Sequence, residues 1–162
     1  MKFRCDRDDL VEALNTASKA VTNRATLPVL NGLRLSLEND TLVITGSDLD
    51  LTITVIVEVS GEKDGISVVP AKLLSDVIRS VESGIVDLTV EETDLQVIAG
   101  RSEFVLRTIP ADEYPIFDEI TTEPVNVDAS MLVKALEQVT PAASSDDSRP
   151  ILTGVYLSLI HI

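Results

Sequence analysis

Few residues of this chain are of a type that could act on a substrate. The 162 residues include one cysteine, Cys5, and one histidine, His161. Ser-His-Asp and Cys-His arrangements both need a histidine held beside a nucleophile, and His161 belongs to a final Ile-His-Ile that departs from the pattern of the rest of the chain. Cys5 stands in a predicted strand near Phe3, a position that favours a small buried hydrophobic side chain over a nucleophile. The sequence therefore predicts no nucleophilic active site.

Two acids in the segment SDLDL, Asp48 and Asp50, are the remaining candidates for chemistry. Alternate residues of a strand face the same side, so both carboxylates could hold a magnesium ion. Such a site needs further ligands, and the sequence contains no clustered Cys/His motif, no GxxxxGK[ST] and no GxGxxG. Capping of a turn is the favoured role for these acids, and a metal-dependent hydrolase is the alternative. We expect no metal and no cofactor.

The distribution of charge is more informative than its sum. The 27 acidic and 13 basic residues give a net charge of −14, which repels phosphates. Three predicted helical regions, 7–24, 70–83 and 129–144, nevertheless carry equal numbers of acidic and basic residues. If the helices share one side of the molecule, that side repels a polyanion far less than the other side does. The mixed charge typical of any helix surface is an equally supported explanation.

Two amphipathic helices are predicted, over residues 8–21 and 70–81. In each segment apolar residues recur at spacings of three and four, which places them on one helix face. Asp6 or Asp8 could cap the first helix, and Pro70 suits the first turn of the second. The two apolar stripes consist of Leu10, Leu14, Ala17 and Val21, and of Leu73, Leu74, Val77, Ile78 and Val81.

Each helix is followed by a block of predicted strands. Segments 33–59 and 85–109 alternate apolar and polar residues, with turn residues at two points in each, and predict three antiparallel strands apiece. The short strand-like pieces KFRC, residues 2–5, and ISVV, residues 66–69, precede the helices. A unit of strand, helix and three strands therefore occurs twice between residues 1 and 109.

The segment TLPVLNGLRLSL, residues 26–37, returns almost unchanged as SRPILTGVYLSL, residues 148–159. From Asp6 to Leu37, 12 of 32 residues are identical to the residue 122 positions later. A repeat of that length indicates tandem domains rather than a solenoid. The second copy begins with a predicted strand, VNV at 125–127, and a predicted helix over 130–139.

This repeat sets the expected domain organisation. We expect a complete first domain over residues 1–120. Residues 121–162 then form a linker and the truncated start of a second domain, which makes the chain a fragment of a longer protein. The final Ile-His-Ile replaces the acidic turn that the repeat predicts, so these three residues are expected to be foreign to the parent protein.

Several motifs in a fixed order resemble the bacterial DNA polymerase III beta subunit, the sliding clamp. They are NRATLPVLNGL, ITGSDLDL, VPAKLL and GRSEFVLRTIPADEYP. The resemblance implies an α+β DNA-clamp fold, in which each domain has two helices packed on two antiparallel sheets built from a repeated β-α-β-β-β unit. It also implies a non-catalytic processivity factor of the replicative polymerase, in which a ring of two chains encircles duplex DNA.

The resemblance also implies which residues contact DNA. Arg24 in NRATLP, Lys72 in VPAKLL, Arg79 in VIRSV and Arg149 in DDSRPIL match basic positions that face DNA in the family. Arginine and lysine are suited to phosphate contacts, which carry no sequence preference. Surface solubility is the alternative role for Lys72 and Arg79, and helix or turn packing is the alternative for Arg149.

The strand SEFVLRT, residues 102–108, falls where one chain of the family pairs with its partner. Phe104 and Leu106 are the implied subunit-interface residues, and burial in the core of their own domain is the alternative. The implied partners are double-stranded DNA, the replicative polymerase, the clamp loader and a second chain, in the bacterial cytoplasm and at no membrane. An acidic β-rich protein-interaction module without DNA binding is the rival function.

Overall fold

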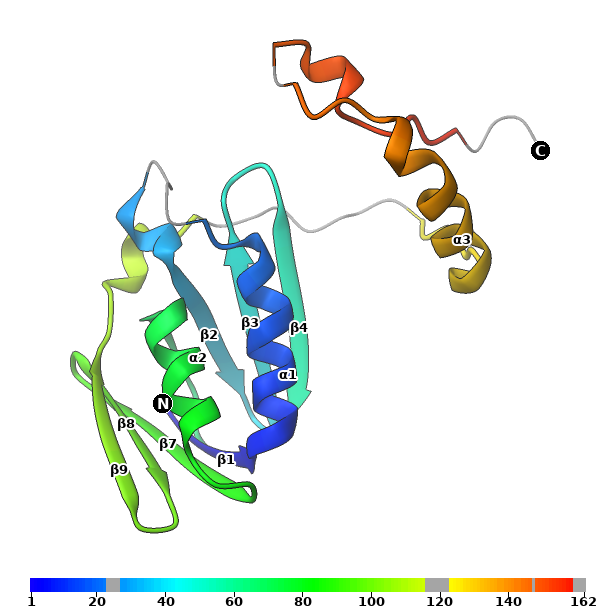
Figure 1. The fold of residues 1–162 in the computed structure, drawn as a ribbon. Coiled ribbons are helices and arrows are strands. Elements are labelled where there is room, and N and C mark those ends of the chain that lie inside the picture. The colour runs from blue at the N-terminus through cyan, green and yellow to red at the C-terminus, as the bar shows by residue number, and fades with distance from the viewer. Residues whose placement is uncertain (23–26, 116–122, 147, 159–162) are drawn as a thin grey trace. The chain divides into compact units, whose positions relative to one another are not determined.

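The computed structural model describes residues 1–22, 27–115, 123–146 and 148–158. The chain divides into two compact units, Met1–Phe117 and Asp118–Ile162. Figure 1 traces both, and each is described here by itself.

The first unit consists of two halves with the same order of elements, as the sequence predicts. Each half runs strand, helix and three strands, and a short strand that the sequence analysis missed, β5 (Ser60–Lys63), lies between them. The first half comprises β1 (Lys2–Asp6), α1 (Arg7–Ala17), β2 (Gly32–Glu38), β3 (Thr41–Ser47) and β4 (Thr52–Glu58). The second comprises β6 (Gly65–Pro70), α2 (Ala71–Ser80), β7 (Ile85–Glu91), β8 (Asp94–Ala99) and β9 (Ser102–Arg107).

The strands form two antiparallel sheets that interlock the halves. One sheet has the order β5-β1-β7-β8-β9, and the other has the order β4-β3-β2-β6. The opening strand of each half therefore pairs with the other half: β1 with β7, and β6 with β2. Neither half can complete its sheet alone, so the two fold as one domain.

The helices α1 and α2 lie side by side against the sheets (Figure 1). Helix α1 packs on β3 and β4, whereas α2 contacts β2, β6 and β9. Their apolar stripes enter one core, in which Leu10 and Leu14 of α1 and Leu74 and Ile78 of α2 are at most 1% exposed. Burial of each such side chain contributes about 1.5–3 kcal/mol. The prediction is wrong for Leu73, which is 49% exposed because it lies about 100° around the helix from Leu74.

Hydrogen bonds at the helix ends join the two halves. Asp6 caps α1, and its carboxylate accepts a hydrogen bond from the backbone N–H of Asp8 at 2.8 Å. The next residue, Arg7, donates from its guanidinium to the carbonyl oxygens of Ile78 (3.1 Å) and Arg79 (2.6 Å). These are the last turn of α2, where unpaired carbonyls attract a cation. Arg7 is therefore a structural residue that ties the start of α1 to the end of α2.

The second unit contains one α-helix, α3 (Ala129–Val139), followed by the short 3-10 helices η4 (Thr140–Ala142) and η5 (Pro150–Leu152). The predicted strand at 125–127 is wrong, because these residues have no regular structure. A strand needs a partner, and the described residues of this unit include none. Within the ranges that the structure describes, no helix is both long and apolar enough to cross a membrane.

Candidate nucleic-acid interface

Two basic side chains stand on one face of α2. Lys72 and Arg79 are seven residues apart, which is about two helical turns, and both are exposed. In the described part of the chain neither forms a salt bridge. By contrast, Lys2 lies 2.5 Å from a Glu62 oxygen, and Arg4 lies 2.7 Å from an Asp87 oxygen. The cationic groups of α2 are therefore more available to a ligand than those of Lys2 and Arg4 on β1.

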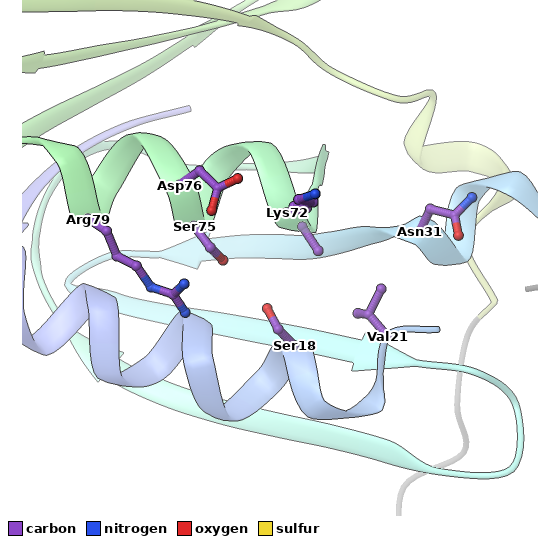
Figure 2. A pocket seen from close by; sticks show the side chains of 8 residues that line it. Ser18, Val21, Asn31, Lys72, Ser75, Asp76 and Arg79 are labelled. Atoms are coloured by element: carbon purple, nitrogen blue, oxygen red, sulfur yellow. The ribbon is translucent and has the colours of Figure 1, made fainter. Parts of the chain in front are cut away.

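A pocket of about 250 Å³ separates the end of α1 and its extension η1 (Ser18–Ala20) from α2. Figure 2 shows its side chains: Lys72, Ser75, Asp76 and Arg79 come from α2, and Ser18 comes from η1. The guanidinium of Arg79 reaches toward α1, where it donates a hydrogen bond to the Asn15 side-chain oxygen. Two of the predicted DNA contacts, Lys72 and Arg79, thus line a common polar pocket.

The layer formed by the two helices is electrically neutral. The first unit as a whole carries 11 basic and 20 acidic residues, a net charge of −9, and all of that excess lies outside α1, η1 and α2. Because the two helices pack side by side, one side of the domain is neutral while the rest is acidic. The charges in this layer are Arg7, Lys19, Lys72 and Arg79 against Asp8, Asp9, Glu12 and Asp76.

The other two predicted DNA contacts do not join this cluster. Arg24 lies outside the described residues. Arg149 belongs to the second unit, where it is exposed and immediately precedes η5. Its backbone carbonyl accepts a hydrogen bond from the N–H of Leu152 at 2.9 Å, so its main chain forms the turn.

Strand β9 is one of the two outer strands of the five-stranded sheet, at the opposite edge from β5. Leu106 is 2% exposed and packs in the core of its own domain, and Phe104 is half-buried against the same core. Val105 on the opposite face is 62% exposed. Any pairing at this edge would therefore use the β9 backbone, because the Leu106 side chain is already packed.

Cys5 and Asp48, two of the residues considered for chemistry, have structural roles. Cys5 is buried, and burial, followed by the charge of Asp6, raises the pKa of its thiol to about 12. One carboxylate oxygen of Asp48 accepts hydrogen bonds from the N–H groups of Asp50 (3.1 Å) and Leu51 (2.8 Å), which confirms turn capping. Among the described residues no cluster of three or more His, Cys, Asp or Glu side chains could hold a metal ion. His161 lies outside the described residues.

A second, smaller core was not predicted. Tyr114 packs with Val29, Leu30 and Val68, and its hydroxyl donates to the carbonyl oxygen of Thr45 at 3.1 Å. Burial raises the pKa of this phenol to about 12. The cluster fixes the 3-10 helix η2 (Pro28–Asn31) against the four-stranded sheet. The only sequence signal was an aromatic residue within an acidic, proline-rich segment.

Two interlocked β-α-β-β-β halves, with paired helices over two antiparallel sheets, define the domain of a DNA clamp. The family described as DNA polymerase III beta subunit, N-terminal domain, matches residues 1–118. This chain therefore belongs to the DNA polymerase III beta subunit family.

Individual relatives agree with this assignment. The beta sliding clamp of Streptomyces coelicolor is 33% identical over 159 residues, which are 98% of this chain and 42% of that protein. The crystal structure of the Bacillus subtilis DNA polymerase sliding clamp matches with a TM-score of 0.91 and 31% identity, over 96% of this chain and 43% of that one. The DNA polymerase III subunit beta from Pseudomonas aeruginosa matches with a TM-score of 0.88 and 32% identity, over 95% and 43%. The chain thus spans less than half the length of these relatives.

Proposed function

We propose that this chain is part of a processivity factor for a replicative DNA polymerase. In that role a ring of clamp domains encircles duplex DNA and tethers the polymerase, and it catalyses no reaction itself. The observation that carries the proposal is the neutral helical layer, with Lys72 and Arg79 exposed on it, in a domain of the DNA polymerase III beta subunit family.

The charge distribution suits a ring that must slide. Contacts to the phosphate backbone are independent of base sequence, so a protein held only by such contacts can move along the duplex. The strands, and above all the turns and loops that join them, carry the excess negative charge and repel DNA, which favours its approach to the helices over its approach to the sheets. Lys72 and Arg79 then supply weak phosphate contacts, and we assign the same role to Arg24 and Arg149.

The ring would be completed by domains that this chain does not supply alone. We assign residues 1–120 to the first clamp domain and 121–162 to a linker and the beginning of the second. Among the described residues no strand pairs with the outer edge of β9 around Phe104 and Leu106, which suits pairing of this backbone with a second chain. The polymerase, the clamp loader and duplex DNA are the proposed partners, and the bacterial nucleoid is the proposed location.

Primer extension tests this function in the full-length protein that contains the chain. The clamp, its loader and its polymerase are assembled on a primed circular template, and product length is measured after a single binding event. We expect products much longer than those of the polymerase alone, and shorter products when Lys72 and Arg79 are both changed to alanine. Products of unchanged length on addition of a loaded wild-type clamp would contradict the proposal.

A further inference from the structure

Two serine hydroxyls in the pocket between the helices have no hydrogen-bond partner among the residues that the structure describes. Ser75 is only 7% exposed, and in the described part of the chain its Oγ and the buried Oγ of Ser18 have no partner. Figure 2 shows both side chains directed into the space between α2 and η1. A helical serine usually bonds a carbonyl of the preceding turn, as Ser80 does with the Val77 oxygen at 2.7 Å. Ser75 forgoes that bond.

Unpaired buried polar groups are rare, and they often mark the place of a ligand. The groups around these hydroxyls indicate what the ligand is. Lys72 and Arg79 contribute two positive charges to the pocket lining, against one negative charge from Asp76. Two hydroxyl donors together with an ammonium and a guanidinium match a group with several acceptor oxygens and a negative charge.

We propose that this pocket holds one phosphate group of the DNA backbone. The Ser18 and Ser75 hydroxyls, which are covered in the free protein, rotate toward the pocket and donate to phosphate oxygens at its floor, while Lys72 and Arg79 neutralise the charge at its rim. Arg79 exchanges its bond to the neutral Asn15 side chain for the phosphate, which requires only rotation of a long, exposed side chain. The proposal rests on the proposed function, which brings duplex DNA to the helical layer.

The size of the pocket fits this ligand. Its volume of about 250 Å³ admits a tetrahedral phosphate together with a few water molecules, each of which occupies about 30 Å³. The lining includes no aromatic side chain on which a base could stack. The pocket is therefore suited to the backbone and indifferent to sequence.

Replacing Ser75 separates a binding role from a structural one. In the free protein the Ser75→Ala change removes an unpaired buried hydroxyl, so the thermal midpoint should rise. The same change removes a phosphate donor, so DNA binding should weaken. Ser80→Ala is the matched control, because it removes an exposed serine of the same helix that does not line the pocket.

The test is an NMR titration of the isotopically labelled 162-residue chain at low salt, with a 12-base-pair duplex in one series and sodium phosphate in the other. We expect the duplex to produce saturable shifts at the amides of Ser18, Lys72 and Ser75. Ser75→Ala should weaken the apparent affinity about three- to tenfold, the effect of one lost hydrogen bond. Lys72→Ala should weaken it and reduce its salt dependence. Ser80→Ala and Lys63→Ala, the latter on β5, should leave it unchanged.

Four results would overturn the inference. If the duplex shifts other helical amides but not those of the pocket, the pocket assignment fails while DNA binding stands. If the duplex shifts no amide, both the pocket and the proposed contact with DNA fail. Shifts with sodium phosphate alone would identify a site for a free anion. A Ser75→Ala variant that is more stable but binds DNA as well as the wild type would show that the Ser75 hydroxyl only destabilises the fold and does not bind DNA.

Discussion

Helices α1 and α3 occupy corresponding places in the two copies of the repeat, 122 residues apart, and their local structures agree closely. Asp6 caps the first helix through the N–H of Asp8, and Asp128 caps the third through the N–H of Met131 at 2.9 Å. Both helices are 11 residues long, and each is followed by a 3-10 turn and then by a second 3-10 helix that begins at a proline. Local sequence alone is sufficient for these features.

Burial differs between the two copies. Leu14 of α1 is fully buried, whereas its counterpart Leu136 of α3 is 37% exposed. Leu30 of η2 is likewise buried, and its counterpart Leu152 is 51% exposed. The first copy has strands from both halves of its domain to pack against, and the described residues of the second unit include none. Caps and turns therefore form from local sequence alone, whereas burial of the helix in a core requires the complete set of strands.

The largest effect is expected when the corresponding leucines of the two helices, Leu14 and Leu136, are replaced by alanine. Leu14→Ala should lower the free energy of unfolding of the first unit by about 2–5 kcal/mol, because it opens a cavity in a closed core. Leu136→Ala, in the second unit, should change the free energy of unfolding of the chain by less than about 0.5 kcal/mol, as expected of a surface substitution. Denaturant unfolding followed by circular dichroism measures both. Equal losses would show that α3 is packed as α1 is.

A smaller effect is expected at the 3-10 helix that only the first copy buries. Tyr114→Phe leaves the carbonyl of Thr45 without its buried donor and should lower the free energy of unfolding by about 1–2 kcal/mol. Hydrogen exchange at the amide of Leu30 should accelerate, because the cluster around Tyr114 holds η2 in place. Exchange at the amide of Leu152, the matched position in η5, should not change. Unchanged exchange at both amides would refute the anchoring role of Tyr114.

The smallest effect concerns the cap of α3. Hydrogen bonds from the Ser130 hydroxyl and then from the Met131 N–H lower the pKa of Asp128 in the folded helix. A lowered folded-state pKa means that the stabilisation is present above the ordinary aspartate pKa near 4, and is lost as the pH falls through the folded value. The α3 amide shifts should therefore move toward coil values in acid, and Asp128→Asn should remove this pH dependence. Identical acid titrations of both proteins would contradict the assigned cap.

The sequence predicted the features that depend on short-range pattern. Period-two alternation indicated the six strands of the two blocks, the spacing of Leu10 and Leu14 indicated α1, and the SDLDL turn indicated capping by Asp48. The prediction of a strand at residues 125–127 was wrong, because a short Val-Asn-Val segment forms a strand only beside a partner strand. The Arg7 contacts with α2 join residues more than 70 positions apart, and no local pattern encodes them.

In the candidate site, too, features set by local sequence could be predicted and features set by tertiary packing could not. The charges of Lys72 and Arg79 could be predicted from their place on an amphipathic helix within a resemblance to a known family. The hydroxyls of Ser18 and Ser75, which have no partner among the described residues, could not be predicted, because their environment exists only once η1 and α2 face each other across the pocket. A serine in a helical sequence gives no sign of a binding site until the hydrogen-bond partners of its hydroxyl are known.

The neutral helical layer is the surface that we assign to contact with DNA. The most direct measurement is the salt dependence of duplex binding by the full-length protein, compared between the wild type and a Lys72→Ala, Arg79→Ala variant. Loss of two phosphate contacts should reduce the slope of log K against log salt by about 1.8. Removal of two strand cations, by Lys2→Ala and Arg4→Ala, should leave the slope unchanged. A slope that is insensitive to the helix variant, or equally sensitive to the strand variant, would contradict the claim.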